Sequence, residues 1–146
     1  MNDDRKEEHM NPYAAYKRQS VTTMTPIEIV VKLYSETERE LNRAIMFIDK
    51  KDFENANKAL TKSGDLVNAL RSVLDVNLPI GQNLDSLYSY FEKQIVTANM
   101  KKDTELIKPL LPMIAELKDA FTQISLMSKT DIATQELQSK NGQPQG

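Results

Sequence analysis

The sequence predicts an all-α fold, an antiparallel up-down-up-down four-helix bundle with a short N-terminal capping helix. Apolar residues recur at alternating steps of three and four along four stretches of 20 to 25 residues, a spacing typical of amphipathic helices. The links between these stretches are short, which makes neighbouring helices antiparallel. Only four glycines and six prolines occur in 146 residues, a length that suits one domain. The predicted helices are about 26–49, 53–76, 81–101 and 104–128.

The first helix has a strong start signal. Thr25 and Glu28 have the spacing of a capping box, in which each side chain accepts a bond from the other residue's amide. Pro26 stands at the first helical position, where its missing donor costs nothing. The predicted inner stripe is Ile27, Val30, Tyr34, Thr37, Leu41, Ala44 and Ile48.

The second helix follows a cap at Asp52 and ends before Pro79, because the residue before a proline avoids helical geometry. Gly64 lies inside it, where glycine costs about 1 kcal/mol relative to alanine. Either Gly64 allows close helix packing, or it leaves a shallow dent in which another chain could lie. The stripe is Phe53, Ala56, Leu60, Ser63, Val67, Leu70 and Leu74.

The third helix lies within NLDSLYSYFEKQIVTANMKKD, and Lys101 and Lys102 suit the negative end of its dipole. Its inner side carries Leu84, Tyr88, Phe91, Ile95 and Ala98.

The fourth helix has a cap at Asp103 and two internal prolines, Pro109 and Pro112. Each proline removes a backbone hydrogen bond and strains the preceding turn. We therefore expect a kink or a short separate first turn. Its stripe is Ile107, Leu110, Ile114, Leu117, Phe121 and Ile124.

Two segments are expected to stay outside the bundle. Residues 1–12 and 129–146 are polar, and both are predicted to be disordered tails flanking a folded domain at 13–128. Tyr13 and Tyr16 belong to a short amphipathic piece that cannot stand alone as a helix, so it must dock on something.

Composition excludes several classes of function. With 27% charged residues and a net charge of −2, there is no basic excess for binding nucleic acid. No apolar run approaches the roughly 18 to 20 residues of a membrane helix, and the acidic start is unlike a secretory signal peptide. The absence of cysteine fits a reducing cytoplasm.

Residues suited to catalysis are scarce. The single histidine, His9, stands in the predicted N-terminal tail, and no Glu-x-x-His pair, phosphate-binding loop or activated nucleophile occurs. We predict no catalytic, cofactor or metal site, and no enzyme activity.

The apolar stripes are wider than a two-residue seam. This width either completes the core or leaves a groove for a partner, and composition does not separate the two interpretations. The flanking residues are Ala59, Leu66 and Val73 of the second helix and Leu106, Met113, Ala120 and Met127 of the fourth.

Three stretches together resemble one known family. They are AAYKRQSVTTMTPIEIVVKLY, NANKALTKSGDLVNALRSVLD and NLDSLYSYFEKQIVTANMKKD, in that order. This pattern is similar to the flagellin export chaperone family (flagellar secretion chaperone, FliS), over residues of about 11 to 125.

The resemblance implies a cytoplasmic chaperone that binds the disordered C-terminal segment of flagellin. Such a protein prevents premature polymerisation and delivers its client to the flagellar type III secretion apparatus. Tyr13 and Tyr16 would belong to an N-terminal cap over the binding site. The implied client-binding groove is Leu33, Tyr34, Leu66, Leu70, Leu84, Leu87 and Tyr88.

A second interpretation stays open. An adaptor or regulatory bundle could bind another helical client, such as an anti-sigma factor or a component of the export apparatus.

Overall fold

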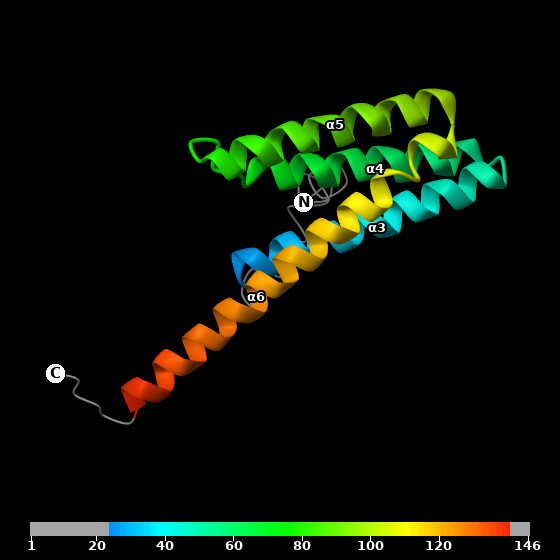
Figure 1. The fold of residues 1–146 in the computed structure, drawn as a ribbon. Coiled ribbons are helices and arrows are strands. Elements are labelled where there is room, and N and C mark those ends of the chain that lie inside the picture. Colours follow the sequence, from blue (N-terminus) through cyan, green and yellow to red (C-terminus); the bar gives the residue numbers. More distant parts are fainter. Residues whose placement is uncertain (1–23, 141–146) are drawn as a thin grey trace, which may run out of the picture.

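A computed structural model describes residues 24–140, with side chains after residue 127 described only at Thr134 and Leu137. Four long helices run alternately up and down (Figure 1). The predicted tail 1–12 and the predicted cap with Tyr13 and Tyr16 lie outside the described residues. The elements are α3 (Pro26–Asp49), α4 (Phe53–Ser72), α5 (Pro79–Lys101), the 3₁₀ helix η1 (Thr104–Leu106) and α6 (Leu110–Lys140).

The start of α3 has the predicted capping box. The Thr25 amide donates to Glu28 Oε1 at 3.0 Å, and the Glu28 amide donates to Thr25 Oγ1 at 3.2 Å. Asp52 caps α4 by accepting from the Asn55 amide at 3.3 Å. These two local signals therefore set where α3 and α4 begin.

The turn between α4 and α5 begins earlier than the sequence predicts, because α4 ends at Ser72 rather than at residue 76. Asp75 accepts from the Asn77 amide through Oδ1 at 3.0 Å and from the Leu78 amide through its carbonyl at 3.1 Å. These bonds take the place of the helical hydrogen bonds that α4 would form if it continued. Pro79 then occupies the first turn of α5, two residues before the predicted start.

The prolines of the fourth helix lead to a separate first turn, so that prediction is confirmed. Asp103 caps η1 by accepting from the Glu105 amide at 2.9 Å, and α6 begins only at Leu110, after Pro109. Pro112 falls in the first turn of α6, where an amide has no helical partner.

The predicted end of this helix needs correction. The tail was expected to be disordered from residue 129, but α6 continues to Lys140 and projects past the other helices (Figure 1). After Pro112 there is no proline or glycine before Gly142, and most of the residues between are good helix formers. The change to a polar composition after residue 128 was therefore not enough to end the helix.

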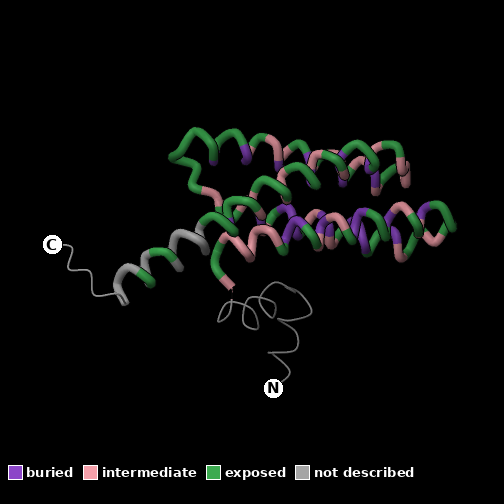
Figure 2. The backbone as a smooth tube through the Cα atoms, turned by 60° about the horizontal axis from the view of Figure 1, so that its bottom comes forward, coloured by how far each residue is buried: buried purple, intermediate pink, exposed green. Residues whose placement is uncertain are grey.

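The core lies where α3, α4 and α5 face one another and where the first half of α6 packs on α3 (Figure 2). Buried hydroxyls are satisfied within their own helices, since Thr37 donates to the Leu33 carbonyl at 2.7 Å and Ser63 to the Ala59 carbonyl at 2.9 Å. Among the described helices, none has the length and apolar content of a membrane span. The largest fully buried side chains are Tyr34, Tyr88, Phe91, Leu41, Leu60, Leu70, Ile95, Ile107, Leu110 and Ile114.

Candidate functional site

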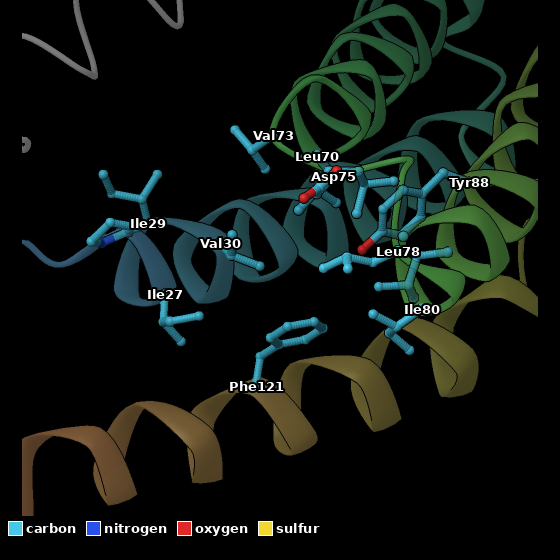
Figure 3. Close-up of a pocket in the computed structure, with 14 residues that line it drawn as sticks. Ile27, Ile29, Val30, Leu70, Val73, Asp75, Leu78, Ile80, Tyr88 and Phe121 are labelled. Carbon is cyan, nitrogen blue, oxygen red and sulfur yellow. The ribbon is translucent and has the colours of Figure 1, made fainter. Parts of the chain in front are cut away.

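An apolar groove of about 500 Å³ opens at one end of the bundle, where four helices contribute side chains (Figure 3). The start of α3, the end of α4, the start of α5 and the middle of α6 all reach it. Asp75 supplies the single charged side chain of its lining. The lining residues are Pro26, Ile27, Ile29, Val30, Leu70, Val73, Leu74, Asp75, Leu78, Ile80, Gly81, Leu84, Tyr88 and Phe121.

The turn between α4 and α5, together with the first residues of α5, makes the outer rim of this groove. Val73, Leu78 and Ile80 are 51%, 50% and 61% exposed, although each is a large apolar residue. Single exposed apolar residues are common, but three beside one apolar cavity form a patch of the kind that marks an interaction site.

Gly81 allows the start of α5 to lie close to the turn that follows α4. A Cβ atom built on it would lie 2.0 Å from the Asp75 carbonyl oxygen, a backbone atom that cannot move without reshaping the turn. Glycine is therefore required at this position for the backbone of α5 to approach the end of α4.

The floor of the groove contains a buried pair of tyrosines. Tyr88 of α5 lines the groove, and its hydroxyl shares a hydrogen bond with the hydroxyl of Tyr34 on α3. Burial, and then the bond to Tyr88, raises the pKa of Tyr34 above its ordinary range. Burial also raises the pKa of Tyr88, although the bond from Tyr34 acts in the opposite direction. Both hydroxyls are therefore neutral at physiological pH.

Helix α6 forms one wall of the groove through Phe121. The ring of Phe121 lies 5.7 Å from that of Tyr34, centroid to centroid, and Figure 3 shows Phe121 pointing toward the rest of the lining. Lys118 donates to Glu38 Oε1 at 2.6 Å, which connects α6 to α3 one turn away. The position of this wall therefore depends on contacts between α6 and α3.

The sequence-predicted groove residues fall into two groups. Leu70, Leu84 and Tyr88 line the groove together. Leu33, Tyr34 and Leu66 are buried in the core and do not line it, and Leu87 is a half-buried residue packed against the core. Their contact with a client stays a prediction.

Several lining residues were not among the predicted ones. Ile29, Val30, Ile80 and Phe121 come from three helices, and only the tertiary arrangement brings them together. A signal was available for Leu78 and Ile80, since two large apolar residues flank Pro79 in a segment that links helices.

The groove has the chemistry of a binding surface. In the part of the chain that the structure describes, no three His, Cys, Asp or Glu residues gather in a way that could hold a metal ion. The groove offers shape and apolar area for a partner's apolar side chains, with a gain of about 25 cal/mol per Å² buried.

The model of the family described as flagellar protein FliS matches residues 9–128 of this sequence. The chain belongs to the FliS family. The flagellar secretion chaperone FliS of Bacillus subtilis (strain 168) is 29% identical over 121 residues, which cover 83% of this chain and 91% of that protein. The FliS of Vibrio cholerae is 30% identical over 116 residues, with coverage of 75% and 85%.

A solved structure supports the fold of this FliS-family protein. A crystal structure of a flagellar chaperone from bacteria superposes with a TM-score of 0.65 at 17% identity, covering 80% of this chain and 96% of that one. The predicted family and the helical bundle are thereby confirmed, and membership of a chaperone family confirms the prediction that the chain is not an enzyme.

Proposed function

We propose that this protein is a flagellar secretion chaperone that binds the C-terminal segment of flagellin in the cytoplasm. It keeps the segment from polymerising before export and delivers the client to the flagellar type III secretion apparatus. The observation that carries the proposal is the apolar groove, in a chain whose family includes flagellar secretion chaperones.

A groove of this kind suits a disordered client with apolar side chains at helical or extended spacing. Filling it removes exposed residues such as Val73 and Ile80 from water, which favours the complex. The client loses conformational freedom as it becomes ordered, and this loss offsets part of the gain. The complex can therefore be specific and still release its client for export.

The N-terminal segment acts as a cap in this proposal. Pro26 and Ile27 line the groove, so the residues just before them are within reach of it. Tyr13 and Tyr16 would cover the apolar lining before the client arrives. Leu33 and Tyr34 support the nearby part of α3 from the core.

Titration of the purified protein with flagellin, and with flagellin lacking its C-terminal segment, tests the function. We expect a complex with full-length flagellin and a loss of at least 100-fold in affinity on truncation. Equal affinity for the two forms would refute the assignment of the C-terminal segment. No complex with either form would refute the choice of flagellin as client.

A further inference from the structure

A second cavity of about 180 Å³ lies on the surface between α3 and α4, and most of its lining residues are polar or charged. Its lining includes Glu40, Arg43 and Phe47 of α3 and Lys58 and Lys62 of α4. Three basic side chains and one carboxylate therefore surround it, an excess of positive charge in a protein whose net charge is −2.

This basic cleft and one edge of the apolar groove lie in line along the α3–α4 pair. Ile29 lines the groove and Glu40 lines the cleft, eleven residues further along α3. Lys62 of α4 and Val73, the C-cap residue directly after α4, show the same separation. Eleven residues are about three helical turns, so on each helix the two residues share a face, separated by about 16 Å.

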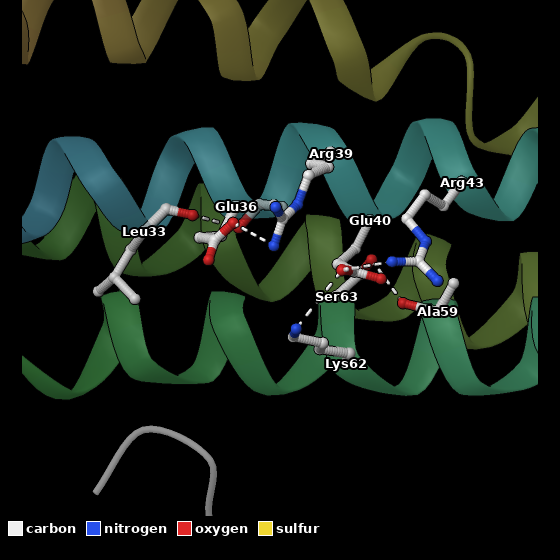
Figure 4. Close-up of polar contacts among 9 residues, drawn as sticks. Leu33, Glu36, Arg39, Glu40, Arg43, Ala59, Lys62 and Ser63 are labelled. Atoms are coloured by element: carbon white, nitrogen blue, oxygen red, sulfur yellow. Dashed lines mark hydrogen bonds and ion pairs between the residues drawn. The ribbon is translucent and has the colours of Figure 1, made fainter. Parts of the chain in front are cut away.

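Two of the three basic side chains of the cleft, Arg43 and Lys62, contact a buried carboxylate. Glu40 is only 3% exposed, and its Oε2 lies 3.5 Å from Lys62 Nζ and 4.0 Å from Arg43 Nη1 (Figure 4). The guanidinium carbon of Arg43 also lies 5.7 Å from the centre of the Phe47 ring. The buried carboxylate and the ring thus orient Arg43 while about half of it stays exposed, at 52%.

We propose that this cleft binds an aspartate or glutamate side chain of the same client segment whose apolar side chains fill the groove. The inference rests on the proposed function, and it adds a recognition element to it. One carboxylate fits the size of the cavity and offsets part of its excess charge, and a guanidinium can donate two parallel bonds to it. The apolar groove supplies affinity, and the cleft sets the register of the client.

The spacing gives the client pattern. About 16 Å corresponds to roughly five residues of extended chain or about eleven residues of helix. The acidic residue of the client therefore follows or precedes its groove-filling apolar residue by one of these two intervals.

The test is a titration of the C-terminal segment of flagellin against three forms of the full-length protein. These are the wild type, Lys58→Glu in the cleft, and the matched control Lys93→Glu, an exposed site on α5 outside both cavities. Lys58 is chosen because the ion pairs of Glu40 with Arg43 and Lys62 stay intact. We expect Lys58→Glu to weaken binding about tenfold and to flatten its salt dependence, with Lys93→Glu unchanged.

A charge exchange completes the experiment. Each acidic residue of the client segment is replaced in turn by lysine, and one replacement should restore binding to Lys58→Glu while weakening binding to the wild type. Equal affinities for Lys58→Glu and Lys93→Glu would overturn the inference and leave the proposed function standing. A loss that no client replacement restores would also overturn it. Failure of the wild type to bind would remove both proposals.

Discussion

Tyr34 of α3 and Tyr88 of α5 bond through their hydroxyls beneath the apolar groove, and both side chains are almost fully buried. Replacing one of them by phenylalanine leaves the other hydroxyl without its partner. We expect Tyr34→Phe to lower the free energy of unfolding by about 1–3 kcal/mol. The double variant Tyr34→Phe/Tyr88→Phe should be closer to the wild type. Urea unfolding measures both, and a double variant whose loss equals the sum of the single losses would contradict the pairing.

The same tyrosines predict a dependence of stability on alkaline pH. An unfolded tyrosine ionises near pH 10, whereas burial raises the pKa of both residues in the folded protein. Above about pH 10 the unfolded chain therefore binds fewer protons than the folded one, so the free energy of unfolding falls with rising pH. Below pH 10 the pair contributes no slope.

Urea unfolding between pH 7 and 11 checks this dependence. The fall above pH 10 should be smaller in Tyr34→Phe/Tyr88→Phe. Tyr90→Phe is the control, because Tyr90 is 42% exposed. An equal fall in both variants would contradict the assignment of this pH dependence to Tyr34 and Tyr88.

Two glycines predict opposite effects of the same substitution. At Gly81 an added Cβ would collide with the backbone of Asp75, so Gly81→Ala should destabilise the protein by more than about 2 kcal/mol and deform the groove rim. At Gly64 a Cβ would meet nothing within 4 Å among the described residues, so Gly64→Ala should stabilise α4 by about 1 kcal/mol. Thermal melts of the two variants make the comparison, and destabilisation by Gly64→Ala would show that the site is not open.

The open space around Gly64 also decides between the two interpretations of this glycine. The prediction that Gly64 allows close helix packing is wrong, since no described neighbour lies near enough to require glycine. The alternative, a dent that another chain could occupy, stays a prediction.

The helices could be predicted because their signals are local. The capping pair of Thr25 and Glu28 and the three-four spacing act within one helix, independently of the rest of the fold. The groove could not be predicted in the same way. Leu33 and Leu70 have the same apolar character and similar spacing, yet only Leu70 lines the groove, because the arrangement of the four helices at that end of the bundle decides which apolar residues line a cavity.

An acidic residue in the groove should block client binding without unfolding the bundle. Ile80 is 61% exposed and lines the groove, whereas Val96 is 58% exposed on the same helix outside it. Ile80 also lies in the first turn of α5, where the helix dipole favours a carboxylate. We expect Ile80→Asp to weaken binding of the flagellin segment at least tenfold, or about 1.4 kcal/mol. Titration of Val96→Asp is the control, and equal effects of the two substitutions would rule out the groove as the binding site.

Removal of the N-terminal segment should expose the groove. If Tyr13 and Tyr16 cover the apolar lining, deletion of residues 1–20 leaves Val73, Leu78 and Ile80 open to a hydrophobic dye. We expect dye fluorescence to rise while the helical circular dichroism signal stays nearly constant, because Thr25 still caps α3 after the deletion. Tyr13→Ser/Tyr16→Ser in the full-length chain separates the tyrosines from the rest of the segment. Dye binding that stays at the wild-type level in both variants would refute the cap. A rise that Ile80→Asp then reverses would locate the bound dye in the groove.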